Sequence, residues 1–344
     1  MPSYRTGTVD AVLSERPGLQ RVSVDGQPAY VLTQLIGTVA IGDEVVCNTT
    51  AVELGLGSGG WNVVHWNLSR RDWSAPGTGH VMKLRYSSLQ VDTGCAEEHN
   101  EYREPANLRG APVVCAVLHS QVLAVVGAIH CIAPDTPIAF VQTDSAALPL
   151  VLSDTIARLD EIGWIHHSVT VGQAFGGDYE AVSFASGLLG ARGRLCEDSV
   201  PRRCVIVAGP GIGVVGTGTR YGFGGIDTAA MLTTVHALGG TPIHALRYSD
   251  VDGRERHRGV SHHSRTIEAL ANHVAVKARP ADIEVDGEVD DAVPVDVPDF
   301  ESAVRAQGLE LRSMGRTYAD DPAFFRFAAA AGAYAAGIEA TLVR

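Results

Sequence analysis

The stretch CVIVAGPGIGVVGTGTRYGFGG, residues 204–225, runs from a short apolar segment into a long glycine-rich loop. Its first part, residues 204–208, is rich in β-branched residues and has no charged position, which is typical of a strand buried on both faces of a sheet. Similar segments occur in PVVCAVLHS (112–120), PIAFVQTD (137–144), SVTVGQ (168–173) and PIHALRYSD (242–250). Helical patterns separate these segments at about 121–133, 146–162, 178–192, 227–238 and 262–274. The alternation predicts an α/β fold with a mostly parallel, doubly wound sheet across residues 111–280.

The chain before this region has a different spacing of predicted secondary-structure elements. Residues 1–70 contain closely spaced strand-like runs separated by Gly, Pro and Asp turns, with little helical pattern. This spacing predicts a small β-barrel-like module, for which a structural or docking role is the default. Residues 71–110 form a connecting segment between the two regions.

The chain after the α/β region begins with an acidic, proline-containing connection and ends in a helix. Within the connection, residues 282–286 alternate acidic and apolar side chains, so this run could also form a half-exposed edge strand. Asp321 and Pro322 have the residue types expected at the N-cap and the first position of a helix. We therefore expect residues 281–344 to contain a C-terminal helix that packs on the α/β domain.

Composition restricts the classes of protein to which the chain can belong. Hydrophobic residues make up 45% of the sequence and charged residues 19%, which is the profile of a folded globular protein. The longest apolar runs are shorter than a membrane span, and the first residues lack the apolar core of a signal peptide. The six cysteines are scattered without a C-x-x-C pair. These features predict a cytoplasmic protein with no membrane association, disulfide framework or structural zinc.

The formal net charge of −12 argues against non-specific nucleic-acid binding, and this charge is unevenly distributed. Residues 282–299 contain eight acidic residues and no Lys or Arg, whereas residues 254–265 contain four arginines and three histidines. A local basic segment on an acidic protein suits a small anionic ligand. The alternative is that these arginines pair with the acidic stretch.

The parallel sheet also predicts where a ligand binds, because ligands of open α/β sheets lie outside the carboxyl ends of the strands. Each of the five predicted strands is followed by glycines or small polar residues. The first two lead to Ser120 and Asp144. The third leads to Asp178, which is either a catalytic carboxylate or only a helix N-cap. The fifth leads to the Arg/His segment, where Arg258 joins the expected ligand-binding residues, so we place the candidate site at this rim.

The fourth strand leads into the glycine-rich loop, which contains a literal G-x-G-x-x-G at Gly211, Gly213 and Gly216. A dinucleotide fingerprint needs a helix to begin at the third glycine, and here we expect none before Asp227, whose position suits an N-cap. The other possibilities are a mobile connection and an anion-binding loop. In the anion-binding hypothesis the loop backbone lines a cavity that Arg220 closes with a bidentate contact. The ligand-binding residues then include Thr217, Gly218 and Thr219.

Three histidines are the leading candidates for acid–base chemistry: His257, His262 and His263. A helix that starts after Ser261 or Ser264 would place His262 and His263 at its N-terminus, where the helix dipole favours the neutral imidazole. A neutral imidazole can act as a general base, a hydrogen-bonding ligand or a metal ligand. The spacing of the three residues matches no standard zinc pattern, so we expect no metal.

Four long segments also carry a likeness to a known family. They are GDEVVCNTTAVELGLGSGGWNVVHWNL (42–68), GHVMKLRYSSLQVDTGCAEEH (79–99), GPGIGVVGTGTRYGFGG (209–225) and RERHRGVSHHSRT (254–266). These segments resemble the hallmark sequences of a bacterial domain-of-unknown-function family, number three-eight-six-six. The resemblance covers most of the chain and implies a bacterial cytoplasmic protein, but no activity, cofactor or catalytic residue. The acidic connection at 281–299 departs from what the family leads us to expect.

Two hypotheses of different classes follow. In the first, the chain binds or transforms a small anionic metabolite, phosphorylated or nucleotide-like, at the strand ends, where a histidine performs acid–base work. In the second, it is a non-catalytic regulatory or scaffold protein that docks a partner through residues 1–70. A metal-dependent hydrolase is a third possibility. The sequence leaves open whether the protein is an enzyme, whether it uses a cofactor and whether it forms a homo-oligomer.

Overall fold

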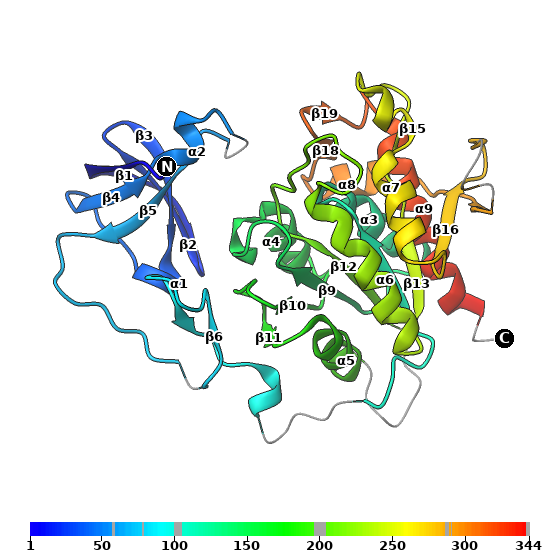
Figure 1. The fold of residues 1–344 in the computed structure, drawn as a ribbon, viewed down its shortest axis with the longest axis horizontal. Helices are drawn as coiled ribbons and strands as arrows, with labels where there is room; N and C mark the ends of the chain where they lie inside the picture. Colours follow the sequence, from blue (N-terminus) through cyan, green and yellow to red (C-terminus); the bar gives the residue numbers. More distant parts are fainter. Residues whose placement is uncertain are drawn as a thin grey trace. The chain divides into compact units, whose positions relative to one another are not determined.

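The computed structural model describes residues 1–56, 59–77, 79–99, 105–195, 204–285, 289 and 291–341. The chain divides into two compact units, Met1–Gly94 and Cys95–Arg344 (Figure 1). Each unit has a hydrophobic core of its own.

The first unit contains a closed barrel of five strands. The strands are β1 (Tyr4–Arg16), β2 (Leu19–Val24), β3 (Gln27–Leu32), β4 (Glu44–Asn48) and β5 (Asn62–Asn67). They close in the order β1-β2-β3-β5-β4, in which β3 and β5 are parallel and the other neighbours are antiparallel. Val22, Val31 and Val45 belong to the core of the barrel. The prediction of a small β-barrel-like module is confirmed.

Short elements occupy the connections of this unit. They are α1 (Thr33–Ile36), α2 (Thr50–Glu53), and the paired strands β6 (Met82–Lys83) and β7 (Val91–Asp92). Helix α1 follows β3, and α2 lies in the connection between β4 and β5.

The second unit contains an eight-stranded sheet in which every pair of neighbours is parallel. The strands are β8 (Pro112–Ala116), β9 (Ile138–Thr143), β10 (His167–Val171), β11 (Tyr179–Ala181), β12 (Val205–Pro210), β13 (Thr241–Ala245), β16 (Val276–Pro280) and β17 (Val293–Val295). Their order in the sheet is β11-β10-β9-β12-β8-β13-β16-β17. The prediction of a parallel, doubly wound sheet is confirmed.

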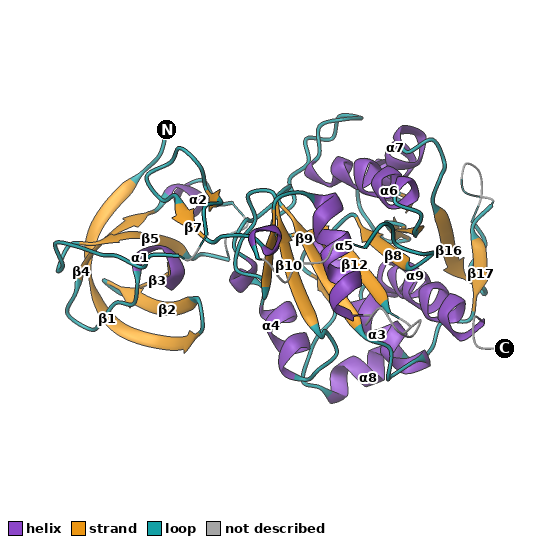
Figure 2. Ribbon diagram, turned by 90° about the horizontal axis from the view of Figure 1, so that it is seen from below, coloured by secondary structure: helices purple, strands orange, loops and turns teal. Residues whose placement is uncertain are grey.

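Helices cover both faces of this sheet (Figure 2). One face carries α3 (Val122–Ile132), α4 (Asp154–Glu161), α8 (Phe300–Ala306) and α9 (Pro322–Thr341). The other carries α5 (Phe184–Leu195), α6 (Thr228–Ala237) and α7 (His262–Leu270). Along β8, Val114 belongs to the first core and Val113 and Cys115 belong to the second. Burial on both faces explains why the strands are apolar at nearly every position.

The structure corrects three local predictions. The pattern at 146–162 forms a 3-10 turn, η3 (Leu150–Leu152), and then the short α4, which Ser153 caps. The pattern at 178–192 contains β11 before α5 begins. Residues 282–285 are not a strand, and residue 286 lies outside the described part of the chain. The strand at this edge is β17, whose central Pro294 suits an edge because it has no N–H to donate.

The C-terminal helix begins where the sequence predicts. Helix α9 starts at Pro322, directly after the buried Asp321, whose carboxylate accepts a hydrogen bond from the Ser249 hydroxyl at 2.7 Å. Helix α9 packs closely on α3 at Gly332, where a Cβ would lie 2.3 Å from the carbonyl oxygen of Val125. No helix in the described part of the chain is long and apolar enough to cross a membrane.

Gly332→Ala is expected to destabilise the fold, because the added methyl group forces α9 away from α3. Overpacking of this kind typically costs about 1–3 kcal/mol. The control is Gly337→Ala on the same helix, where a Cβ meets nothing within 4 Å and where better helix propensity favours alanine. Urea unfolding of the two variants checks this prediction, and equal midpoints would contradict it.

Candidate functional site

The sheet has a topological switch point at the carboxyl end of β8. From β8 the chain continues to α3 on one face of the sheet, whereas from the neighbouring strands β12 and β13 it continues to α6 and α7 on the other face. Connections that leave adjacent strands toward opposite faces open a ligand-binding crevice between them. The loops that follow β12 and β13 are the glycine-rich loop and the Arg/His segment, so both lie at this position.

The segment after β13 brings three histidines together. Strands β14 (Tyr248–Ser249) and β15 (Gly259–Val260) pair antiparallel. The connection between them contains the 3-10 turn η5 (Glu255–His257). Ser261 is the N-cap of α7, and its Oγ accepts a hydrogen bond from the backbone N–H of His263 at 3.2 Å. The predicted helix start after Ser261 is therefore confirmed.

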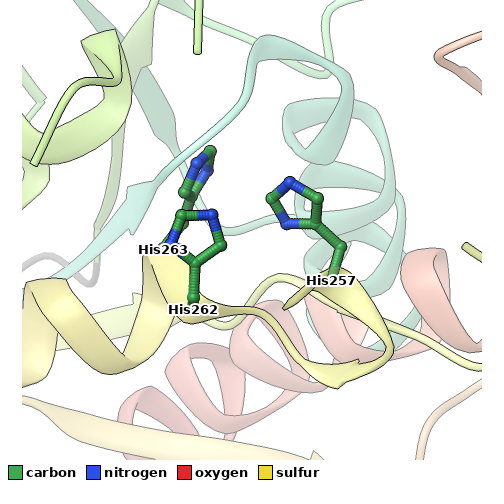
Figure 3. Close-up of side chains that lie close together, drawn as sticks. All are labelled: His257, His262 and His263. Carbon is green, nitrogen blue, oxygen red and sulfur yellow. The ribbon is translucent and has the colours of Figure 1, made fainter. Parts of the chain in front are cut away.

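We call His257, His262 and His263 the histidine cluster. Their ring centroids are 4.9 Å apart for His257 and His262, 4.8 Å for His257 and His263, and 4.4 Å for His262 and His263. Figure 3 shows the two helix histidines beside each other and the His257 ring facing them from the preceding turn. The sequence predicted these three residues as candidates, and the fold places them in mutual contact.

The hydrogen bond from Arg247 fixes where the His263 ring carries its proton. Arg247 Nη1 lies 3.1 Å from Nδ1 of His263. Because a guanidinium only donates, Nδ1 accepts and the neutral ring carries its N–H at Nε2. His257 Nδ1 lies 2.7 Å from the Oγ of Ser261, a hydroxyl that can donate to the ring or accept from it. His262 Nε2 is buried and has no hydrogen-bond partner among the described residues.

Arginines surround the histidine cluster. Arg247 follows the end of β13, and its side chain is only 5% exposed. The buried Asp252 carboxylate lies 3.7 Å from Arg247, 2.8 Å from Arg254 and 3.3 Å from Arg316. The hydrogen bond from Arg254 holds the pKa of Asp252 well below its usual range. Arg316 also pairs with Asp321 at 3.2 Å, so two carboxylates face these three guanidinium groups.

The described carboxylates of the acidic connection include ones that pair with cations outside the Arg/His segment. In the described part of that connection, Asp282 pairs with Arg326 and Asp291 pairs with Lys277. Arg254 pairs with Asp252 from its own loop. The alternative in which the Arg/His segment is neutralised by the acidic stretch therefore receives no support from these pairs.

Burial lowers the pKa of all three imidazoles, and neighbouring arginines lower it further. The pKa falls to about 3 for His257 and to about 2 for His263, in both cases through burial first and the charge of Arg247 second. For His262 the charges of Arg256 and Arg247 follow burial as causes. The imidazoles are neutral at pH 7, and burial, rather than the helix dipole invoked from the sequence, is the largest cause.

Three imidazoles this close raise the question of a metal ion. One nitrogen of each ring lies within 4.8 Å of the others. Nitrogens bound to one zinc ion at about 2.1 Å are at most about 3.6 Å apart, whereas three N–H groups that share one oxygen at about 2.8 Å are up to about 4.8 Å apart. A metal-bound histidine also donates its second ring N–H to an acceptor, but here Arg247 donates to His263. A cation bound at Nε2 of His263 would therefore require this ring to give up its hydrogen bond from Arg247.

The glycine-rich loop forms a hairpin against this cluster. Gly216 pairs antiparallel with Phe223, and the Phe223 ring stacks on His263 with centroids 3.8 Å apart. A Cβ at Gly218 would lie 3.2 Å from the guanidinium of Arg256. At Gly211 a Cβ would lie 2.1 Å from the carbonyl oxygen of Ala147, so close backbone packing requires glycine there. The loop therefore packs at its base and against His263, whereas residues 215–221 are exposed.

The polar groups of the loop are not arranged as the sequence suggested. The Thr217 hydroxyl contacts Gly222 O at 2.9 Å and Thr219 Oγ1 at 3.0 Å, so both threonines are used inside the hairpin. Arg220 is exposed and lies over the Tyr221 ring at 5.1 Å. Gly213 has a φ of +83° and open space around it. The arginine that packs against the loop is Arg256, which corrects the expectation that Arg220 closes the cavity.

Other predicted site residues have structural partners or lie elsewhere. The Asp178 carboxylate accepts from Ser168 N and Oγ at 2.8 and 2.9 Å, which ties it to β10 at the far side of the sheet. Asp144 accepts from Gln173 N at 2.9 Å, and Ser120 Oγ lies 2.9 Å from Ser313 Oγ. Arg258 is exposed. The structure thus does not bring Asp178 into contact with the histidine cluster.

Asp227 stands at the N-cap of α6, as the sequence predicts, but without a side-chain cap. A 3-10 turn, η4 (Gly224–Asp227), precedes α6, and the Asp227 side chain makes no capping hydrogen bond. Burial and then the neighbouring Asp144 carboxylate raise the pKa of Asp227. No helix begins at Gly216, so the G-x-G-x-x-G match is not a dinucleotide fingerprint.

Sequence reasoning missed the arginines that shape the site. Arg247 comes directly after the apolar run of the fifth predicted strand. This strand-end position could have identified it as a candidate site residue. The contact of Phe223 with His263 could not be predicted from the sequence, because only the folded hairpin brings the two rings together. The Met314 Sδ, 3.3 Å from Arg247 Nη2, comes from the turn between β18 (Arg312–Ser313) and β19 (Arg316–Thr317), far along the chain.

Comparison with known proteins gives one match. The sequence model of one family, described as a protein of unknown function, matches residues 28–332. The match begins in β3 and ends within α9, so it includes the whole histidine cluster. No curated protein and no solved structure matches the chain.

Proposed function

The chain belongs to the DUF3866 family of proteins of unknown function, and from the geometry of its own site we propose that it binds a small anionic metabolite at the carboxyl ends of β12, β8 and β13. The metabolite is of the phosphorylated or nucleotide-like class. One oxygen of its anionic group occupies the space between the three imidazoles, and the surrounding arginines neutralise its charge.

The observation that carries this proposal is the contact from Arg247 to Nδ1 of His263. It turns His263 Nε2 into a donor. This neutral N–H group and the surrounding guanidinium charge favour an anion over a metal ion. Neutral donors in a buried site can also stabilise an oxyanion without giving up a proton.

A reaction at this site would use His262 as its acid–base group. Its Nε2 has no hydrogen-bond partner among the described residues, whereas the Nδ1 atoms of His257 and His263 are engaged. The positive surroundings disfavour the imidazolium form, and a bound anion would offset that effect. Proton transfer by His262 would therefore be coupled to anion binding.

A thermal-shift experiment tests the proposal. Inorganic phosphate, pyrophosphate, a nucleoside monophosphate and zinc chloride are each titrated into the purified protein. We expect at least one phosphate compound to raise the melting temperature, since a ligand at a hundred times its Kd adds about 2.7 kcal/mol of stability. Zinc is expected to give no saturable increase.

Two variants give the experiment its control. His262→Ala is expected to lose most of the anion-induced shift, whereas Arg220→Ala, at the exposed tip of the loop, is expected to keep it. The proposal is wrong if no phosphate compound stabilises the protein, or if His262→Ala responds as the wild type does.

A further inference from the structure

The barrel has the strand arrangement of an oligonucleotide/oligosaccharide-binding fold. Five strands close in the order β1-β2-β3-β5-β4, with a parallel contact between β3 and β5. In barrels of this arrangement the outer face of the second and third strands is the usual binding surface. Fold alone does not assign a ligand, so the side chains on that face decide.

Two aromatic rings and one arginine lie together on this face. Arg21 of β2 pairs in register with Tyr30 of β3, which pairs in turn with Val63 of β5. The Tyr30 ring stacks on Trp61, with centroids 4.8 Å apart and planes 14° from parallel. The Arg21 guanidinium lies 5.7 Å from both ring centroids. All three side chains are partly exposed.

The charge of this face differs from that of the whole chain. The exposed or partly exposed positions of β2 and β3 are Arg21, Ser23, Gln27, Pro28, Tyr30 and Leu32. The single charged group among these six described positions is the guanidinium of Arg21. Met1–Gly94 contains seven basic and eight acidic residues, a net charge of −1, and the remaining 20 basic and 31 acidic residues give the other unit −11. The charge argument against nucleic acid therefore applies to the α/β unit and not to the barrel.

We propose that the outer face of β2 and β3 binds single-stranded nucleic acid, with bases stacking against Tyr30 and Trp61 and Arg21 contacting the adjacent phosphate. Base stacking on aromatic rings tolerates any sequence, and arginine adds cation–π and phosphate contacts. Asp10 of β1 adds one carboxylate beside Ser23, so the stacked rings, rather than a surplus of positive charge, carry the proposal. This site is independent of the histidine cluster.

Fluorescence anisotropy of the full-length protein with a labelled oligothymidylate of about 16 nucleotides, the upper site size for one barrel of this type, tests the proposal. We expect saturable binding at low salt that weakens as salt rises. Tyr30→Ala and Trp61→Ala are each expected to weaken binding about fivefold to a hundredfold, the effect of losing one stacked base. Arg21→Ala is expected to reduce both the affinity and its salt dependence.

Trp73→Ala is the matched control. Trp73 also stacks with an arginine, Arg70 at 4.9 Å, but it lies against Gly37 after α1 rather than on β2 or β3. Circular dichroism establishes whether each variant is folded. If an aromatic variant does not fold, Arg21→Ala still tests the proposal. The proposal is overturned if the oligonucleotide does not bind, if folded Tyr30→Ala and Arg21→Ala bind as the wild type does, or if duplex DNA binds equally well.

Discussion

Arg247→Ala is expected to remove anion binding almost completely. The side chain donates to His263, approaches Asp252 at 3.7 Å and contacts the Met314 sulfur. Without it, His263 is free to move its proton to Nδ1, and the site loses both a fixed donor and a full positive charge. A hydrogen bond to a charged group contributes about 1.5–3 kcal/mol, so the affinity for phosphate falls by roughly tenfold to a hundredfold or more.

The matched comparison uses two other arginine variants. Arg247→Lys keeps the charge but loses the planar fork that reaches His263 and Asp252 together, so we expect an intermediate affinity. Arg220→Ala removes an exposed guanidinium from the loop tip and is expected to bind as the wild type does. Isothermal titration with the phosphate compound that stabilises the wild type checks the series. Equal affinities of wild type and Arg247→Ala would contradict the assigned role.

Stability is expected to fall steeply as the pH drops below about 6.5, the pKa of an unfolded histidine. The pKa of His257 is lowered to about 3 and that of His263 to about 2 in the folded protein. As the pH falls below 6.5, these two imidazoles therefore bind protons in the unfolded chain but not in the folded protein. Each such histidine removes about 1.4 kcal/mol of stability per pH unit within this window. The loss begins near pH 6.5 and continues downward to about pH 3.

The measurement is the free energy of unfolding by urea from pH 8 to pH 4.5. Over this range most carboxylates stay ionised in the unfolded chain, because their pKa values there lie near 4. Burial raises the pKa of Asp160, Asp227 and Asp321 in the folded protein, so these three groups oppose the slope. His119, whose pKa burial also lowers, adds to the slope with the same sign. Ring signals in NMR spectra identify the contribution of the cluster. A midpoint near 6.5 for His257 and His263 in the folded protein would contradict the prediction.

Much of the fold follows from local sequence patterns. The runs after Pro112, Pro137 and Pro242 were predicted as buried strands because apolar residues continue on both faces. The helix start at Ser261 and the C-terminal helix at Pro322 follow from capping chemistry within a few residues of chain. Where two elements compete within one short run, as at β11 and α5, local pattern cannot choose between them. Strand β17 was not predicted, because it forms by pairing with β16, a contact that the local sequence pattern does not specify.

Burial of charge is also invisible in the sequence. Glu268 and Lys277 have the residue types of a solvated surface, yet each side chain is only 2% exposed and the two charges lie 3.6 Å apart. Likewise, the glycines after β12 suggested a backbone cradle for an anion. The structure uses them for close packing against residues such as Ala147 and Arg256.

The sequence by itself therefore predicted the N-terminal barrel, the parallel sheet, a candidate rim and the three histidines that the fold brings into contact, although the first compact unit ends at Gly94 rather than at residue 70. These features depend on the periodicity of side chains, on caps and on the ends of strands, all of which are local. Only the tertiary structure decided which charges surround those histidines, that Arg247 and Arg256 rather than Arg220 face them, and that Asp178 lies elsewhere. Such contacts join residues far apart in the chain, and their energies depend on burial and distance, which no local pattern specifies.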